Sequence, residues 1–325
     1  MTFCNSQRGV ALLTALLVVA LATIAATSMA TRQQFDMRGT GNLLHGEQAW
    51  AYVLGAESWA RVVLARDDKD SKVDHLSEDW AIQVPASFVE GGSVTGRVID
   101  LQGRFNVNNL VVAGKTDPDA VIRYKRLLAT LGLDASLADT LADWLDSDIN
   151  ASLNGAEDQN YQILTPAYRA ANRPAVDISE LRLVKGYDEK AMLKLTGGGI
   201  RPPLITALPE ATTININTAS AEVLTTLYQG MSLSEGTALV ETRGDTGFET
   251  VTDVLASPVL SGKPVDQTQL SVQSKWFLMV GEANVGQGRA KLASLIQRSA
   301  GATIVVRRQR EFYDPVQLLP PPPPQ

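Results

Sequence analysis

One loop carries the side chains best suited to chemistry. The run from Asp146 to Glu157, DSDINASLNGAE, places oxygen-bearing side chains at positions 1, 3, 5, 7, 9 and 12. This is the ligand spacing of a twelve-residue calcium loop. Its oxygens meet the six to eight ligands that calcium requires without nitrogen or sulfur, and magnesium is less suited to such a cage. The candidate metal ligands are Asp146, Asp148, Asn150, Ser152 and Glu157.

The loop departs from an EF-hand in two ways. Position six is Ala151 instead of glycine, and Pro166 comes before any clear exiting helix. We therefore expect the ligands to be arranged differently. The alternative is that these acids cap the helix expected over 137–145 and solvate a loop. Against that alternative, clustered carboxylates repel one another, and a divalent ion supplies the missing positive charge. A bound ion would be structural, because nothing in the loop suggests an open coordination position or a general base.

Other chemistries find little support in the sequence. It contains no G-x-S-x-G, S-x-x-K, H-E-x-x-H or P-loop motif. The two histidines, His45 and His75, lie in no metal-ligand or triad spacing, so we expect surface or packing roles. Cys4 is the only cysteine, which excludes an internal disulfide. A net charge of −6 gives no basic footprint for nucleic acid. We predict that the protein is not an enzyme.

The elements that position the loop begin with a membrane span. Residues 10–30 carry no charge, and 21 residues of helix are roughly 30 Å long, the thickness of a hydrocarbon core. Past an interruption at Gly39 and Gly41, apolar residues recur at helical spacing and predict a half-buried stem helix that ends in the charged run 66–70. The stripe consists of Trp50, Val53, Leu54, Ala60 and Leu64.

The residues before the span indicate which kind of targeting signal it belongs to. A secretory signal has its cleavage site after the apolar run, whereas here the polar leader MTFCNSQRG ends at Gly9, before it. Gln7-Arg8-Gly9 followed by the apolar run from Val10 resembles a type IV prepilin signal. The resemblance implies cleavage after Gly9 by prepilin peptidase, which makes Val10 the first mature residue. The alternative is an ordinary signal anchor.

One position narrows the resemblance further. Most pilins and pseudopilins have glutamate at mature position five, where this chain has the uncharged Thr14. This departure is typical of the minor pseudopilin K family of type II secretion systems. In that family the protein lies at the fibre tip, where no subunit above supplies an ammonium partner for a buried carboxylate.

Strand patterns occur on both sides of a long helical stretch. Residues 93–110 read as a hairpin, and β-rich runs return at 276–280, 292–297 and 303–307. A lone hairpin is only marginally stable, so we predict one α+β pilin-like antiparallel sheet interrupted by an inserted all-α domain. The run Asp100 to Asn108 resembles the family's strand before the insert. The expected segments are a leader 1–9, a transmembrane helix 10–30, a stem helix and first strands 31–110, an inserted domain 111–272, returning strands 273–313 and a proline-rich tail 314–325.

The strongest competing motif lies inside the insert. Residues 213–227 and 247–255 resemble helix-hairpin-helix (SAM-like) modules that bind DNA backbones, so the alternative function is a membrane-anchored DNA-binding protein of a competence-type system. Residues 212–262, however, contain Arg243 as their only basic residue against six acids. Because phosphate contact relies on lysine and arginine, this surface should repel a duplex. We expect a structural role, with Asn217 and Ser220 capping helices.

The family resemblance carries further expectations. It implies a minor pseudopilin at the pseudopilus tip that nucleates or caps fibre assembly, anchored once in the bacterial inner membrane with its C-terminal domain in the periplasm. It implies partners among the other minor pseudopilins (I, J and H), the major pseudopilin, inner-membrane assembly components and prepilin peptidase, and no nucleic acid. It also implies structural calcium in the insert, where residues 155–161 resemble the calcium-binding region and add Asp158 as a candidate ligand.

Overall fold

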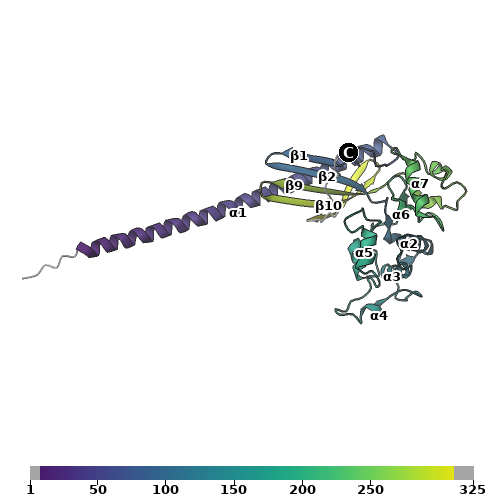
Figure 1. Ribbon diagram of the computed structural model, residues 1–325, viewed down its shortest axis with the longest axis horizontal. Coiled ribbons are helices and arrows are strands. Elements are labelled where there is room, and N and C mark those ends of the chain that lie inside the picture. Colours follow the sequence, from purple (N-terminus) through teal and green to yellow (C-terminus); the bar gives the residue numbers. More distant parts are fainter. Residues whose placement is uncertain (1–7, 311–325) are drawn as a thin grey trace, which may run out of the picture.

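The computed structural model describes residues 8–310, and two of the predicted features, the leader up to Gln7 and the proline-rich tail, lie outside that range. A single helix, α1 (Arg8–Asp70), runs from the apolar segment into the folded part of the molecule (Figure 1). By its length and composition, α1 is able to span a membrane. Among the first 30 residues of α1, every side chain that the structure describes is exposed, as a segment that faces a bilayer requires.

The expected break at Gly39 and Gly41 is absent, and α1 continues through both glycines. Each glycine costs a helix interior about 1 kcal/mol, but propagation from long helical segments on both sides outweighs that cost. The expected end of the helix at Asp70 is confirmed. Val53, Ala60 and Leu64 are fully buried, at 0 to 2% exposure, so the predicted stripe is the face that packs on the sheet.

A five-stranded antiparallel sheet packs along the second half of α1 (Figure 1). Its order is β1-β2-β9-β10-β11. Contacts of α1 with β9 and β10 dominate, so the helix lies over the centre of the sheet. The strands are β1 (Val84–Val89), β2 (Gly92–Asp100), β9 (Trp276–Val285), β10 (Gly288–Ser299) and β11 (Ala302–Arg310).

The prediction of a hairpin within residues 93–110 is wrong. β2 pairs with β1 on one side and with β9 on the other, and the chain leaves the sheet after Asp100. The next strand, β3 (Phe105–Asn106), pairs in parallel with β6 (Ile205–Thr206) instead. The sequence VPASFV of β1 has proline and only weak alternation, which is why the pattern did not reveal this edge strand.

Between β2 and β9 the chain forms a separate, mostly helical body with its own core. The helices pack around a large buried cluster that includes Leu127, Leu141, Leu195 and Leu224. Short strand pairs accompany them, so this body is not purely α-helical. Its elements are η1 (Val107–Leu110), β4 (Val111–Val112), β5 (Lys115–Thr116), α2 (Pro118–Thr130), α3 (Ser136–Leu145), α4 (Asp158–Tyr161), η2 (Ile178–Leu183), α5 (Glu189–Thr196), β7 (Ile214–Asn215), α6 (Ala221–Leu224), α7 (Leu233–Arg243), α8 (Val251–Ala256), η3 (Gln267–Gln269) and β8 (Leu270–Ser271).

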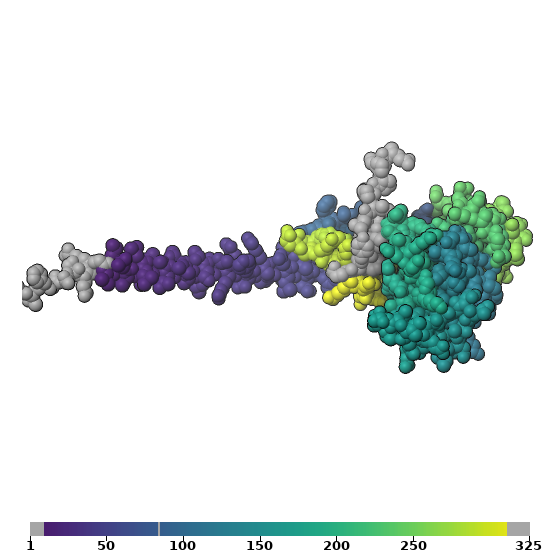
Figure 2. Space-filling model, turned by 60° about the horizontal axis from the view of Figure 1, so that its bottom comes forward, coloured from purple at the N-terminus to yellow at the C-terminus, as the bar shows by residue number. Residues whose placement is uncertain are grey.

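This helical body lies at the end of α1 that is remote from the apolar half (Figure 1). The space-filling view shows it as a broad head on a thin stem, several times wider than the helix (Figure 2). The sheet therefore stands between the membrane-spanning part of the chain and the inserted body.

A network of buried polar groups joins the sheet to the insert. Asp100, at the end of β2, accepts hydrogen bonds from the Asn215 amide (2.9 Å), the Thr218 hydroxyl (2.5 Å) and the Ser274 hydroxyl (2.7 Å). Asn215 also donates to the backbone carbonyl of Asp74, 3.1 Å away. Since buried polar groups are costly unless satisfied, these bonds fix the insert at one place on the sheet.

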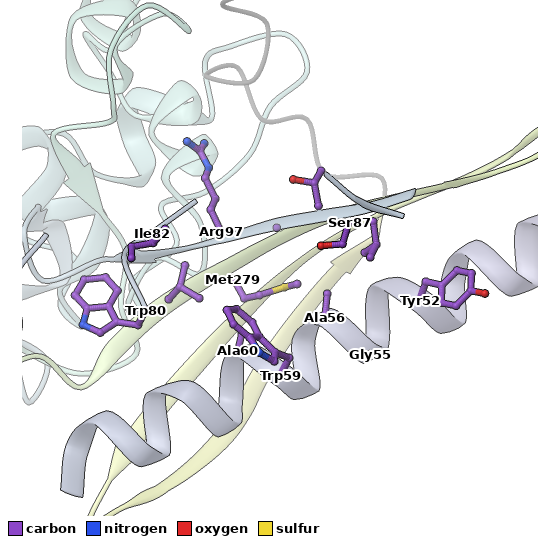
Figure 3. A pocket seen from close by; sticks show the side chains of 14 residues that line it. Tyr52, Gly55, Ala56, Trp59, Ala60, Trp80, Ile82, Ser87, Arg97 and Met279 are labelled. Carbon is purple, nitrogen blue, oxygen red and sulfur yellow. The ribbon is translucent and has the colours of Figure 1, made fainter. Parts of the chain in front are cut away.

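A crevice between α1 and the sheet is lined by apolar side chains (Figure 3). Its volume is about 280 Å³. Trp59, Ala60 and Met279 lie on the helix side of β2, whereas Arg97 points to the opposite side of that strand (Figure 3). The face of β2 toward the stem helix is therefore apolar, and Arg97 lies on the other face (Figure 3).

Candidate metal centre

Three of the predicted ligands come together where α3 ends. Asp146, Asp148 and Glu157 each bring one carboxylate oxygen to within 4.8 Å of the others. Asp146 is the residue after α3, where the backbone becomes extended, and Glu157 precedes α4. The loop between them thus returns the chain to its starting point, as the sequence spacing predicted.

Several oxygens of this group are buried and lack hydrogen-bond partners. Both carboxylate oxygens of Glu157 and the Oδ1 of Asp146 are in this state. The side chains are nearly inaccessible, at 3% exposure for Glu157 and 6% for Asp146. Within residues 8–310, no lysine or arginine forms an ion pair with Asp146, Asp148 or Glu157. Buried, unpaired carboxylates are costly, so this group of residues fits a bound cation.

The electrostatics of the group follow from this burial. Burial raises the pKa of Glu157 to about 7, and the neighbouring carboxylates Asp143 and Asp146 push it in the same direction. Burial also raises the pKa of Asp146, although the Thr116 hydroxyl, 3.0 Å from its Oδ2, works against the shift. A divalent ion would reverse both effects, because it favours the ionised carboxylates.

The other predicted ligands have different surroundings. Asn150 donates to Asp148 Oδ1 from its backbone nitrogen at 2.7 Å and from its amide at 3.0 Å, so it buttresses Asp148. Ser152 donates its backbone N–H to Asp143 Oδ2 at 3.0 Å. Asp158 faces another loop, where its Oδ1 accepts the Ala170 N–H at 2.9 Å and its Oδ2 lies 3.7 Å from Arg169.

Two residues of this region were missed in the sequence. Asp143, on the last turn of α3, is 2% exposed and holds the loop through Ser152. A Cβ on Gly155 would lie 1.7 Å from Asp143 Oδ2, so only glycine permits this approach. Asn172 donates to the Asp148 carbonyl at 2.9 Å, and its own Oδ1 is buried without a partner. The i, i+3 spacing of Asp143 and Asp146 could have identified Asp143 from the sequence, whereas nothing in the sequence indicated a role for Asn172.

These features fit a hard cation such as calcium. The donors are oxygens only, they include orphaned buried carboxylate atoms, and the loop approaches closely enough to require glycine at 155. The arrangement differs from an EF-hand, because α4 has only four residues and gives no exiting helix of the usual length.

The helix-hairpin-helix segments form compact helical units in the same body. Ser220 caps α6, as expected, but Asn217 does not cap a helix: its amide and carbonyl bond the backbone of Phe248 at 3.0 and 2.7 Å. Arg243, the one basic residue of 212–262, donates to the carbonyls of Ile216 and Ala219. Its guanidinium is therefore used to hold the hairpin unit together.

Comparison with known proteins assigns the family. The family model of type II secretion system protein K matches residues 103–210 and 214–273. A type II secretion system protein K from Pseudomonas aeruginosa is 40% identical over 93% of this chain and 92% of its own length. The protein K of Aeromonas hydrophila is 35% identical, over 95% and 98% of the two chains.

The chain belongs to the type II secretion system protein K family. The fold agrees, because a chain in the crystal structure of the GspK-GspI-GspJ complex from enterotoxigenic Escherichia coli aligns with a TM-score of 0.73 and 29% identity, over 84% of this chain and 99% of that one. The role of this chain is accordingly that of a minor pseudopilin with a single-pass membrane anchor. The comparisons give no support to the DNA-binding alternative.

Proposed function

We propose that this protein is the tip subunit of the type II secretion pseudopilus, where it nucleates or caps fibre assembly for protein export across the outer membrane. The observation that carries the proposal is the position of the inserted body at the end of α1 that is remote from its apolar half (Figure 1). Pseudopilin stem helices enter one membrane side by side, so a subunit stacked above would have to occupy the space that this body fills. The chain acts as a structural component and performs no catalysis.

The amino-terminal helix supports the same position. Thr14 donates its hydroxyl to the carbonyls of Val10 and Ala11 at 3.1 and 3.0 Å, so its polar group is satisfied within its own helix. A glutamate there would need a cation from a neighbouring subunit. Cleavage between Gly9 and Val10 places the mature amino terminus at the start of the apolar span, in the inner membrane, with the folded part in the periplasm.

The partners follow from the neighbouring structure and the family. That structure is a complex of proteins K, I and J, and we propose that this chain assembles with its own I and J subunits. Protein H, the major pseudopilin, inner-membrane assembly components and prepilin peptidase complete the proposed set.

Co-purification of the full chain from membranes tests the tip assignment. Tagged wild-type protein should bring down pseudopilins I and J, and mass spectrometry should find Val10 as the first residue. Thr14→Glu should reduce recovery of the complex, because it places a carboxylate with no partner in an apolar environment. A mature chain that retains Cys4, or equal recovery of I and J with Thr14→Glu, would contradict the assignment.

We also propose that calcium is a structural cofactor of the inserted body. Asp146, Asp148 and Glu157 would hold it, with Asn150, Ser152 and Asp158 as the remaining candidates from the sequence. The ion would supply positive charge to buried carboxylates and so join the end of α3 to the start of α4. Metal analysis of protein purified in calcium, before and after chelation, tests this: about one calcium per chain is expected, and its absence would count against the site.

A further inference from the structure

The loop between α3 and α4 contains a second reactive feature, the dipeptide Asn154-Gly155. It is the only Asn-Gly pair in the sequence. In such a pair the backbone nitrogen of glycine can attack the side-chain amide carbon of asparagine, because glycine has no Cβ to shield that nitrogen. Asparagine is among the residues that change chemically with time and heat. The pair is therefore a candidate for deamidation, a covalent change that needs no enzyme.

The fold requires the glycine of this pair. A Cβ at position 155 would lie 1.7 Å from Asp143 Oδ2 and 2.5 Å from Ser152 Oγ. A larger residue would displace Asp143, which is 2% exposed and accepts the Ser152 N–H at 3.0 Å. The contact that closes the loop therefore leaves the amide of Asn154 next to an unshielded backbone nitrogen.

The side chain of Asn154 is open to solvent and unrestrained. It is exposed and lies in a turn in which the Gly155 N–H donates to the Ser152 carbonyl at 3.0 Å. Leu153, the residue before it, is 98% exposed. Among residues 8–310 the Asn154 amide has no hydrogen-bond partner, so it is free to turn toward the Gly155 nitrogen.

The other exposed asparagines of residues 8–310 are Asn42, Asn150 and Asn284, and each is better protected. Asn150 and Asn284 donate their amides to a carboxylate two residues earlier, at 3.0 and 3.1 Å, and are followed by alanine and valine. Asn42 lies inside α1, where helical hydrogen bonds fix the main chain. Only Asn154 combines exposure, a free amide and a following glycine.

We propose that Asn154 is a site of spontaneous deamidation in the folded protein. The Gly155 nitrogen bonds to Asn154 Cγ, and the side-chain amide group leaves as ammonia with the proton of that N–H. Water then opens the cyclic succinimide at either carbonyl, which gives aspartate or isoaspartate. Both products add a carboxylate to a loop whose acids, Asp146, Asp148 and Glu157, form no ion pair with lysine or arginine among residues 8–310.

Calcium should slow this reaction, an effect that rests on the calcium proposal above, whereas the modification site rests on the chain alone. Ring closure requires rotation of the main chain at Asn154, and this residue lies between Asp148 and Glu157 in the sequence. An ion bound to both of those carboxylates lowers the population of open loop conformations in which the rotation takes place.

Incubation of the full chain in detergent at mildly alkaline pH, in chelator and in calcium, tests both steps. Trypsin releases residues 127–169 as one peptide, because no lysine or arginine precedes its last residue. Mass spectrometry should show conversion of amide to acid at Asn154 and not at Asn150, a control within the same peptide. Conversion in chelator should approach that of a synthetic peptide of residues 148–159 and should be slower in calcium. Asn154→Gln, whose longer side chain disfavours ring closure, should lose the product and keep the unfolding midpoint.

Three results would overturn the modification site. The first is equal conversion at Asn150 and Asn154. The second is absence of product in the folded chain while the synthetic peptide converts, because the loop would then block ring closure. The third is an unchanged yield of acid in Asn154→Gln, which would place the reaction at another residue. Equal rates in chelator and calcium would overturn the protection if metal analysis finds calcium bound, and would count against the calcium cofactor itself if none is bound.

Discussion

Two groups of three carboxylates occur within residues 8–310, and their geometry is alike. Asp67, Asp74 and Glu78 gather where α1 ends, and a second trio gathers where α3 ends. In each group, carboxylate oxygens from all three residues lie within 4.8 Å of one another. Distances between acids alone therefore do not say which group needs a metal ion.

The difference is the source of positive charge. In the first group Arg298, 2% exposed, donates to Asp67 at 2.7 Å and to both oxygens of Asp74 at 2.7 and 2.5 Å. Glu78 accepts the indole N–H of Trp80 at 2.7 Å. The second group has no such cation among residues 8–310, and three of its oxygens lack any partner. One group has a positive counter-charge from the chain itself, and the other has none among residues 8–310, so it is suited to a cation from solution.

The largest effect is expected from removing the internal cation. Arg298→Met leaves Asp74 buried without its partner, and breaking such a pair from one side costs about 3–5 kcal/mol. Urea unfolding of the full chain in detergent, at pH 8, measures the loss. The pH matters because burial raises the pKa of Asp74 to about 7, and protonation at lower pH would relieve part of the cost.

Arg66→Met is the control for that measurement. Arg66 is 74% exposed and lies 3.5 Å from Asp70, an ion pair of the kind that contributes under about 1 kcal/mol. Adding Asp74→Asn to Arg298→Met should recover part of the stability, because the pair then loses both charges. If Arg298→Met costs no more than Arg66→Met, the first group is not held by its arginine and the comparison fails.

Calcium should stabilise through the second group by an intermediate amount. Binding to the folded state alone raises the free energy of unfolding by about 2.7 kcal/mol when free calcium is a hundred times its dissociation constant. Thermal unfolding in chelator and then in calcium measures the shift. Magnesium should do less, because it is smaller and dehydrates reluctantly. Glu157→Gln, which removes a charge at nearly constant volume, should abolish most of the calcium effect.

Equal unfolding midpoints in chelator and in calcium would show that the acids of the loop do not bind calcium and only solvate a turn. A calcium shift that survives in Glu157→Gln would place the ion elsewhere. Arg298→Met serves as a cross-check, since it should retain the calcium shift while losing stability in both conditions.

The pH dependence of the metal-free protein should be spread over more than two pH units, between the ordinary pKa of Glu157 and its raised value. The pKa of Glu157 in the folded chain is about 7, above the ordinary 4.5, so the folded state binds this proton more tightly than the unfolded state does. Stability is then highest below about pH 4.5 as far as this group is concerned, and it is lost as pH rises through 7, by at most about 1.4 kcal/mol per pH unit. Denaturant unfolding in chelator from pH 5 to 8 measures the slope.

The control for that slope is Glu157→Gln, which should remove the contribution of this residue and leave that of Asp74, whose raised pKa acts in the same direction. In calcium the Glu157 contribution should reverse, because protonation releases the ion. An identical slope in wild type and Glu157→Gln would show that Glu157 does not titrate in this range.

The sequence predicted the parts of this molecule that rest on local pattern. The apolar run from Val10, the buried stripe through Val53 and Leu64, and the returning strands are all periodic features, and each has its own burial signal. The partnership of β2 with β1 and β9 was not predictable in the same way. It depends on contacts between segments far apart in the chain, which periodicity does not encode.

The residues of the candidate site also fall into those that a local sequence pattern indicates and those that it does not. Asp146, Asp148 and Glu157, which the structure brings together, could be named as candidates because their spacing is local. Asn172 approaches from a different loop, and Asp143 acts through a close approach that only Gly155 allows, so neither could be assigned from spacing in the loop. Arg298 is the clearest case: it lies more than 200 residues from the acids it neutralises, and nothing near it in the sequence marks its role.

The smallest effect is expected at Asp158, which the family resemblance suggested as a ligand. Its Oδ1 accepts the Ala170 N–H at 2.9 Å, and its Oδ2 lies 3.7 Å from Arg169, whose side chain is 79% exposed. Asp158→Asn keeps the Oδ1 acceptor and loses only an exposed ion pair, so stability should change by less than about 0.5 kcal/mol and the calcium shift should remain. Asp146→Asn is the matched change within the trio, and it should reduce the calcium shift. Thermal unfolding of both variants, with and without calcium, separates the two residues. If Asp158→Asn removes the calcium shift as fully as Glu157→Gln, then Asp158 turns from Ala170 toward the ion on binding, and the second group contains four carboxylates instead of three.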